Sequence, residues 1–397
     1  MSNKLEDKLE NVHNKTFSKD DVPSNRTKKL LLILAVSFLF VIVFSNMPNL
    51  GPNNVLGWIK YQLIGMDISE GYPKNIVGSC INDNNFKVVD KDVIALSDTS
   101  FEVLDSKGNE ISGRQHNLSA PILKTGGNNS IIYSLGGTSF QIETKLDNIY
   151  KGAVKNNIIS GAVAQNGSYA LVTEKRGYLG ELTVFSKKNE EKYKYSFSEY
   201  YINDVSISKN GRNIAVSGIS SENGQLKSVI YVFKINSDRP ILTLKYDNSM
   251  ILELDVLSNG NVIAIGDTLT SVVNIRSKKR TNYCYRGKSL TSFDVDKRNG
   301  AVLSLASTRD SDDNNIVLVD SRGNADYSKE TNLRIEALSY KNNTVAALCS
   351  GRVYLYNHSL HFKGDYGVGD DAKQVRLYTP RRAYILGVSE IRNIRLN

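Results

Sequence analysis

Hydrophobic and polar residues alternate along this chain in short runs that are separated by Asn-Gly dipeptides. The run "INDVSISKNGRNIAVSG" (residues 202–218) shows the arrangement, with one alternating segment on each side of Asn210-Gly211. Such alternation predicts strands with one buried face. Asn and Gly tolerate the positive φ values that a two-residue hairpin turn requires. The pattern therefore predicts a β-hairpin at this point.

Similar hairpins recur at nearly constant spacing. The turn dipeptides lie at residues 166–167, 210–211, 259–260, 299–300 and 342–343, and their second residues are 44, 49, 40 and 43 positions apart. A period of about 40–50 residues with several strands in each unit is typical of propeller blades. The second and third strands of a unit are rich in Val, Ile and Ala at both parities, as expected for sheets that are covered on both faces.

The repeat extends over most of the chain. Units are expected to start near Phe86, Pro121, Ile158, Ile202, Ile251, Leu290, Leu333 and Lys373. The last unit has only three strands, and a spare run, "NIVGSC", precedes the first. We therefore expect Ile76–Cys80 to pair with the strand around Glu390–Leu396, because closing the ring protects the sheet edges. The predicted fold is all-β, an eight-bladed β-propeller. Seven blades is the alternative if one unit is merged or the first lies outside the ring.

An apolar segment precedes the repeats. Residues 30–44 are strongly apolar and no charged residue lies between Leu30 and Ile59, so the stretch to Leu50 approaches the ~20 residues of a membrane-spanning helix. The basic cluster Arg26–Lys29 precedes it, which places residues 1–28 in the cytoplasm by the positive-inside rule. A cleaved signal peptide, with a small-residue site at Val43 and Ser45, is the alternative.

These features divide the chain into four parts. We expect a disordered cytoplasmic tail over 1–28, a transmembrane helix over 29–50, a juxtamembrane helix and linker over 51–72, and an extracytoplasmic propeller over 73–397. In the third part, apolar residues recur at helical spacing beside Trp58. This short helix either lies on the outer membrane surface or packs under the soluble domain. The chain is therefore predicted to be a single-pass protein of the cell membrane that contacts lipid through its N-terminal helix.

Composition and charge narrow the function classes. The chain has 397 residues, is 40% hydrophobic and carries a net charge of +9, so global disorder is excluded. Its basic residues are scattered, with Arg276–Arg280 ("RSKKR") the tightest cluster, whereas nucleic-acid binding requires a concentrated face. No nucleic-acid partner is expected. The positive charge favours a solvated surface or attraction to an anionic cell-envelope polymer.

The order of the motifs carries a resemblance. The basic tail and apolar segment are followed by "WIKYQLIG", "GYPKNIVG", "VIALSDTSFEVLDSKG" and the hairpin units. This order resembles membrane-anchored propellers of the WD-repeat-like and quinoprotein-like type. It is more closely similar to a Gram-positive bacterial family of uncharacterised propeller proteins. The resemblance implies an anchored extracytoplasmic propeller and no known reaction. Trp58 is the only Trp, so the blade tryptophans of quinoprotein enzymes are absent and no quinone cofactor is expected.

Candidate metal ligands are few. The four histidines are His13, His116, His358 and His361, and no neighbouring Cys or Glu pair completes the three or four ligands of a zinc site. The loop "DSDDNN" places Asp310, Asp312 and Asn314 like the start of a calcium loop. However, its glycine position holds Asn315 and its twelfth position holds Ser321. No metal is expected.

The remaining motifs do not indicate a nucleotide site or a disulfide framework. The run "GVGDDA" (residues 367–372) matches a nucleotide-binding pattern but lacks the βαβ unit which that pattern needs. The cysteines are odd in number and far apart in the sequence: Cys80, Cys284 and Cys349. We therefore expect buried strand cysteines, and a single disulfide between two of them is the alternative. On an outer strand, Tyr193, Tyr195 and Phe197 share one face. They either pack between blades or form an aromatic binding patch.

These observations favour a binding or scaffolding module whose partner is held on the propeller loops. The partner would be another envelope protein or a wall polymer. Because no catalytic motif occurs, the chain is not expected to be an enzyme, and no catalytic, cofactor-binding or metal residue is assigned. Two alternatives are a glycan-active hydrolase or lyase with axial carboxylates, and a transmembrane sensor. Clustered charges with strongly shifted pKa values around the axis would favour the enzyme.

Overall fold

The computed structural model describes Ser37, residues 68–308 and residues 311–396. The predicted tail, transmembrane helix and juxtamembrane helix therefore lie outside the described residues, apart from Ser37. In the part of the chain that is described, no helix has the length and apolar character needed to cross a membrane. All the described strands lie between Lys74 and Arg395, within the unit that comprises residues 60–397.

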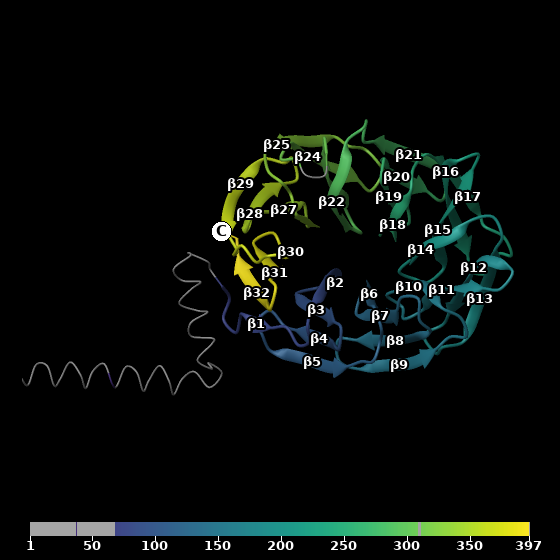
Figure 1. The fold of residues 1–397 in the computed structure, drawn as a ribbon, viewed down its shortest axis with the longest axis horizontal. Helices are drawn as coiled ribbons and strands as arrows, with labels where there is room; N and C mark the ends of the chain where they lie inside the picture. Colours follow the sequence, from purple (N-terminus) through teal and green to yellow (C-terminus); the bar gives the residue numbers. More distant parts are fainter. Residues whose placement is uncertain (1–36, 38–67, 309–310, 397) are drawn as a thin grey trace, which may run out of the picture. The chain divides into compact units, whose positions relative to one another are not determined.

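This unit is an eight-bladed propeller, as predicted. The described strands form eight four-stranded antiparallel sheets, arranged as blades around one axis (Figure 1). Blades 1 to 8 are numbered from the sheet that contains β2. The innermost strands, in blade order, are β2 (Ile81–Val89), β6 (Pro121–Gly126), β10 (Ile158–Val163), β14 (Tyr201–Ile207), β18 (Ile251–Val256), β22 (Ser289–Asp296), β26 (Ala337–Lys341) and β30 (Gln374–Thr379).

The remaining strands complete each blade outward. The second strands are β3 (Asp92–Ser97), β7 (Asn129–Ser134), β11 (Tyr169–Lys175), β15 (Asn213–Glu222), β19 (Val262–Gly266), β23 (Gly300–Ala306), β27 (Thr344–Cys349) and β31 (Arg382–Leu386). The third strands are β4 (Ser100–Leu104), β8 (Ser139–Thr144), β12 (Tyr178–Phe185), β16 (Gln225–Lys234), β20 (Leu269–Asn274), β24 (Asn314–Asp320), β28 (Arg352–Asn357) and β32 (Glu390–Arg395). The outermost strands are β5 (Glu110–Gln115), β9 (Asn148–Ala153), β13 (Glu191–Phe197), β17 (Leu242–Asp247), β21 (Lys279–Cys284), β25 (Tyr327–Thr331), β29 (Phe362–Gly367) and, in blade 8, β1 (Lys74–Asn75).

The ring closes in blade 8 with one strand from the start of the domain, as predicted, but earlier residues make the pairing. Lys74 pairs with Ile391 and Asn75 with Glu390. Ile68 adds a bridge to Ile394. The expected segment Ile76–Cys80 contributes only its first residue, whose N–H donates to the Ser389 carbonyl at 2.9 Å. The chain then turns toward blade 1, where the Ser79 N–H donates to the Asp98 carboxylate.

Most of the Asn-Gly hairpins are longer than the predicted two-residue turns. In "SKNGRN" the Gly211 N–H donates to the Ser208 carbonyl, and the Ser208 N–H donates to the Asn213 carbonyl. Gly211 has φ of +70°, so the glycine takes the left-handed position that follows the turn. The Asn342-Asn343 turn has the predicted two-residue form, because both asparagines have positive φ and Lys341 pairs with Thr344.

Side chains between neighbouring blades form the core. The second strands are almost wholly buried, and all six residues of β27 are buried. The aromatic residues of β13 pack against the next blade: the ring centroids of Tyr195 and Phe233 lie 4.8 Å apart, and those of Phe197 and Tyr231 lie 5.5 Å apart. The interpretation of these residues as interblade packing is therefore confirmed.

Candidate functional site: the axial channel and its mouth

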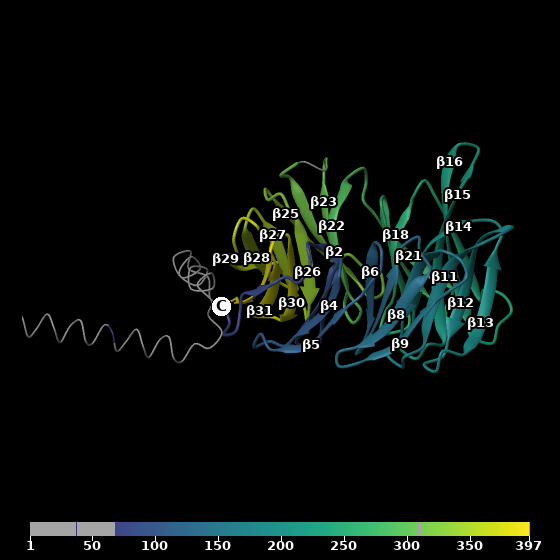
Figure 2. The ribbon, with the colours of Figure 1, turned by 60° about the horizontal axis from the view of Figure 1, so that its bottom comes forward.

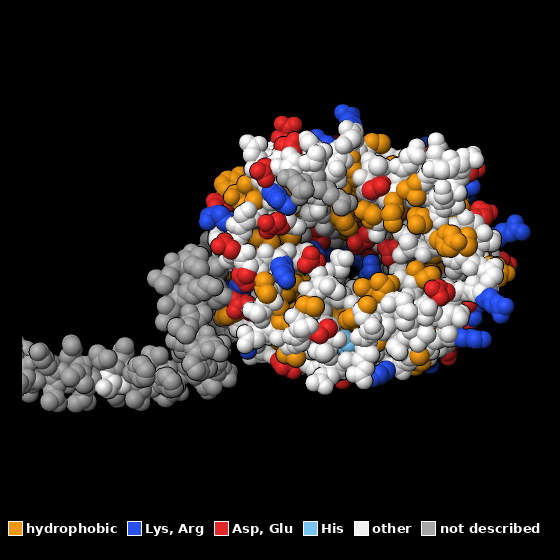
Figure 3. All heavy atoms as spheres, viewed as in Figure 1, with side chains coloured by type: hydrophobic (Ala, Val, Ile, Leu, Met, Phe, Trp, Pro, Cys, Tyr) orange, Lys and Arg blue, Asp and Glu red, His pale blue; other side chains and the backbone are white. Residues whose placement is uncertain are grey.

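The antiparallel order of each blade gives the propeller two distinct faces. The inner strands begin on one face, which also carries the loops between second and third strands. We call this the entry face. The β15–β16 hairpin projects from it in the side view (Figure 2). Viewed from this face, a central opening is visible in which acidic and basic side chains meet (Figure 3). The opening is the mouth of an axial channel lined by the inner strands.

Side chains of the inner strands bind the backbone of the next blade. An Asp204 carboxylate oxygen accepts the Leu254 N–H at 3.0 Å. The Asp294 carboxylate accepts the Tyr340 N–H at 2.8 Å, and the Ser339 hydroxyl oxygen accepts the Leu377 N–H at 2.9 Å. Each inner strand is a sheet edge with unpaired N–H groups. These side chains satisfy that edge and fix the spacing of the channel wall.

The channel wall also carries charged side chains of both signs. Asp204 accepts a hydrogen bond from the Ser160 hydroxyl at 2.9 Å and lies 3.7 Å from the Lys124 ammonium. Across the ring, Arg376 forms an ion pair with Asp294 at 2.9 Å. We call the following residues the channel cluster: Lys87, Lys124, Asp204, Glu253, Asp255, Asp294 and Arg376.

Two members of the channel cluster differ from the others. Among the described residues, Lys87 and Glu253 form neither a hydrogen bond nor an ion pair through their side chains. Burial within the ring, followed by the nearby Arg376 guanidinium, lowers the pKa of Lys87 to about 8. Burial also raises the pKa of Glu253, against the opposing effect of Lys124 and Lys87. Because unpaired groups in a cleft with strongly shifted pKa values are candidates for function, these two residues are the chemically distinctive feature of the channel.

The Lys124 ammonium shows the opposite behaviour. The neighbouring Asp204 carboxylate raises its pKa, so Lys124 stays charged at any physiological pH. Opposite charges in an enclosed site stabilise each other's ionised form. The Lys124–Asp204 pair is therefore a fixed part of the wall, whereas Lys87 titrates close to neutral pH.

Exposed apolar side chains surround the mouth of the channel. They lie at the starts of strands or in loops of the entry face, and Tyr201 has 63% of its surface exposed. In Figure 3, hydrophobic side chains are distributed around the central opening. We call the following residues the entry rim: Val77, Leu135, Tyr178, Tyr201, Leu252 and Val388. Exposed apolar patches with polar surroundings are typical of interaction surfaces.

Among the described residues, the histidines and the acidic loop singled out in the sequence are not brought together with the channel, while His13 and Asp310 lie outside the described residues. His358 lies in the β28–β29 loop, where its ring stacks edge-on against Tyr327 at 5.1 Å. Among the described residues, no group of three His, Cys, Asp or Glu side chains has metal-binding geometry. In the acidic loop, the Asn314 side chain is turned into blade 6 and accepts a hydrogen bond from Ser304 at 2.7 Å. It therefore does not face a loop cation.

The structure also shows the surroundings of the segment 367–372, the basic cluster and the cysteines. The segment 367–372 is followed by the strand β30 rather than by a helix, and its Asp371 pairs with Arg392. Arg280 of the basic cluster lies over the Tyr246 ring, 4.5 Å from its centroid. All three cysteines are free. Cys349 is buried on β27 as predicted, but Cys80 and Cys284 are exposed, so the expectation of burial is wrong for these two. Cys284 is exposed because it lies on the outermost strand of its blade, where no further strand covers it.

The channel cluster is not among the residues predicted from the sequence, although the sequence carries a signal for it. Six of the eight inner strands contain a charged residue within an apolar segment, for example Lys87 in "FKVV" and Asp204 in "INDVSIS". A charge inside the innermost strand of a propeller blade can only face the axis or a neighbouring blade. Assigning the first strand of every unit to the axis would therefore have identified these residues.

Comparison with known proteins identifies a family and a fold. The model of the "Family of unknown function (DUF5711)" matches residues 73–396. No curated protein shows a significant sequence match. The predicted resemblance to a propeller family of unknown function is confirmed by the family match and by similar solved structures.

Three solved structures show the fold alone, because their sequence identities are low. The C-terminal WD40 domain of Sif2 has a TM-score of 0.58 at 11% identity, covering 84% of this chain and 99% of that chain. BamB from Moraxella catarrhalis has a TM-score of 0.51 at 9% identity, covering 81% and 97%. Sqt1 from Saccharomyces cerevisiae has a TM-score of 0.52 at 11% identity, covering 82% and 100%.

Proposed function

Since the chain belongs to the DUF5711 family of unknown function, we propose its function from the geometry of the entry face: it is a scaffolding module that binds another cell-envelope protein. The propeller fold suggests an interaction or scaffolding role. The entry rim is the observation that carries the proposal, because it exposes six large apolar side chains around one axis. A partner that covers this rim removes apolar surface from water, which is favourable.

The partner has a defined chemistry in this proposal. Its apolar side chains cover the entry rim, and a polar loop enters the channel mouth. The loop carries groups that pair with Lys87 and Glu253, the two members of the channel cluster without partners among the described residues. Desolvated charge pairs and apolar anchors at the centre of an interface contribute most of its binding energy.

Membrane attachment is part of the same proposal. The apolar segment from Leu30 and the preceding cluster Arg26–Lys29 support an anchor with the propeller outside the membrane. Protease added to intact protoplasts tests the orientation. We expect the propeller to be cleaved or released while a cytoplasmic control protein stays intact. Complete protection of both would contradict the external location.

Site-specific photocrosslinking tests the docking face. A photoreactive phenylalanine analogue replaces Leu135, Tyr201 or Leu252 in the full-length chain in its native membrane. Matched control positions on the opposite face are Leu146, Tyr327 and Phe362, which are also exposed apolar residues. We expect a discrete protein adduct from the entry rim and none from the controls. Adducts from both sets alike, or from the controls only, would exclude the entry face as the docking site.

The channel cluster also favours a second candidate, an axial glycan hydrolase or lyase. Its support is the unpartnered Glu253, whose raised pKa suits a general acid, beside Lys87. Asp204 and Asp294 are engaged in the wall contacts described above, so Glu253 is the carboxylate assigned to proton transfer. The test is turnover of envelope glycan by the purified chain and by a Glu253→Gln variant. Activity that is lost in the variant supports the enzyme, and inactivity of the parent chain excludes it.

A further inference from the structure

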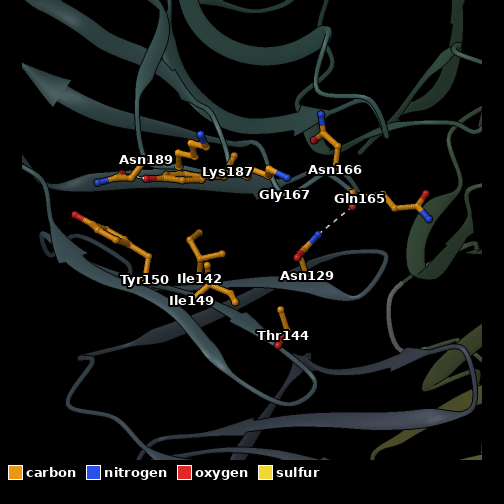
Figure 4. A pocket seen from close by; sticks show the side chains of 12 residues that line it. Asn129, Ile142, Thr144, Ile149, Tyr150, Gln165, Asn166, Gly167, Lys187 and Asn189 are labelled. Carbon is orange, nitrogen blue, oxygen red and sulfur yellow. Dashed lines mark hydrogen bonds between the residues drawn. The ribbon is translucent and has the colours of Figure 1, made fainter.

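A second cavity lies away from the channel, on the face opposite the entry face. It has a volume of about 390 Å³ and lies between blades 2 and 3, where the hairpin turns of both blades meet. Figure 4 shows Lys187 and Asn189 of blade 3 on one side and Tyr150, Ile142 and Ile149 of blade 2 on the other. This volume falls within the range of small-molecule sites. The crosslinking experiment above does not address it.

The framework of the cavity is held by internal contacts. The Asn129 amide N–H₂ donates to the Ala164 and Gln165 carbonyls, both at 3.1 Å, and so ties the two blades together. Tyr169 also lines the cavity, and its ring stacks on Phe185 with centroids 4.9 Å apart. Burial raises the pKa of Tyr169, so its hydroxyl stays protonated and donates to the Asn189 amide oxygen. A cavity with such a fixed wall is preorganised for a ligand.

The groups left for a ligand are of three kinds. The Asn129 amide oxygen and the Asn189 amide N–H₂ have no hydrogen-bond partner among the described residues. Lys187 and Lys188 are exposed at the rim and form no ion pair with the described residues, and none of the lining residues is acidic. Tyr150 and Ile149 present apolar surface, and Ile149 is 53% exposed. The cavity therefore combines positive charge, amide groups and an aromatic wall.

We propose that this cavity binds an anionic saccharide, that is, a sugar unit that carries a phosphate or carboxylate group. The ring C–H groups of the sugar pack against Tyr150 and Ile149. Its hydroxyl groups bind the free amide groups of Asn129 and Asn189. Its charged substituent lies at Lys187 and Lys188, whose ammonium groups donate charge-assisted hydrogen bonds to it. Such bonds are stronger than hydrogen bonds between neutral groups. An uncharged sugar leaves the lysines unused, and a free anion leaves the amide groups and the apolar wall unused.

Calorimetric titration of the full-length chain in detergent tests the proposal at constant ionic strength. The probes are glucose 6-phosphate, hexagalacturonate, glucose and inorganic phosphate. We expect glucose 6-phosphate, hexagalacturonate or both to bind at least about tenfold more tightly than glucose or phosphate. Preference for the hexamer indicates a polymeric source, and preference for the monomer indicates a free sugar phosphate. Failure of both charged sugars to bind, or phosphate binding equal to theirs, overturns the proposal.

Matched variants locate the binding. The Lys187→Gln/Lys188→Gln variant should weaken binding of the charged sugars at least about tenfold, and Tyr150→Ala should weaken it without changing its salt dependence. The control, Lys192→Gln/Lys194→Gln, removes the same charge from the adjoining strand, where both lysines are paired with glutamates. An equal loss in the control would assign the binding to general charge and would overturn the proposed site. Because all four lysines are exposed, each variant should melt at the parent temperature.

Discussion

At the scale of single residues, the ring controls the ionisation of Lys87. An amine with a pKa of about 8 is about one tenth unprotonated at pH 7 and about nine tenths at pH 9. Only the unprotonated amine reacts with acylating reagents. We predict that the acylation rate of Lys87, followed by mass spectrometry of the folded chain, rises through pH 8 and levels off near pH 9. A rate that keeps rising to pH 10 would contradict the shifted pKa.

Linkage gives a second measurement of the same shift. The unfolded chain binds more protons than the folded one between pH 8 and 10.5, because the folded pKa of Lys87 is lowered from 10.5. The resulting cost to stability is therefore fully present below pH 8 and is relieved as the pH rises toward 10.5. Lys87→Met should be more stable than the parent chain in urea denaturation at pH 7, and this difference should shrink by pH 10.

Gly211 is a second residue whose role follows from local geometry. Its φ is +70°, and an added Cβ would lie 3.0 Å from the Ser168 Cβ. We predict that Gly211→Val destabilises the propeller by ~1–3 kcal/mol through backbone strain. Gly211→Asn is the control, because Asn tolerates the left-handed region. Urea denaturation of both variants checks the prediction, which fails if Val and Asn have the same effect.

At the scale of elements, the inner strands depend on the side chains that bridge them. Asp204 binds the Ser160 hydroxyl, the Leu254 N–H and the Lys124 ammonium. We predict that Asp204→Ala lowers the free energy of unfolding by about 3–5 kcal/mol, because it removes the ion-pair partner of Lys124 inside the ring. Asp204→Asn should lose less, since an amide oxygen still accepts the Leu254 N–H. Equal losses in urea denaturation would show that the bridge contributes nothing.

The strands themselves could be predicted from the sequence, while their precise partners could not. The period-2 alternation and the turn dipeptides place the inner strands of blades 2 to 6 within one residue. In blade 1 the inner strand begins at Ile81 rather than Phe86, because an irregularity between these residues extends the pairing with β3. In blade 7 it begins at Ala337 rather than Leu333. These differences depend on pairing with other strands, which alternation within one segment does not specify.

At the scale of the whole molecule, the sequence repeat predicts the ring of blades, but it does not predict the cavity between two blades. Eight units and one missing strand follow from periodicity and from edge protection. The cavity between blades 2 and 3 combines Tyr150 of one unit with Lys187 and Asn189 of the next. Each of these residues is an ordinary loop or strand residue within its own unit. Only the angle at which two blades meet brings them together, and no local sequence pattern encodes that angle.

Ring closure is the property on which the stability of the whole domain depends. Residues 68–76 pair with β32, and Tyr72 is buried among them, with its hydroxyl donating to the Asp105 carbonyl at 2.7 Å. This segment therefore joins blade 8 to blade 1. Removing it exposes the edge of β32 and the apolar surfaces of both blades.

We predict that a chain starting at Val77 aggregates or melts at least about 5 °C below one starting at Ile68, because loss of a large buried aromatic side chain alone costs several kcal/mol. Differential scanning calorimetry and light scattering provide the measurement. Tyr72→Ala in the longer chain separates the two contributions, since it removes the buried ring and keeps the strand pairing. It should melt between the two. If the shorter chain stays monomeric and melts at the temperature of the longer one, blade 8 is stable without its N-terminal strand, and the ring does not depend on this closure.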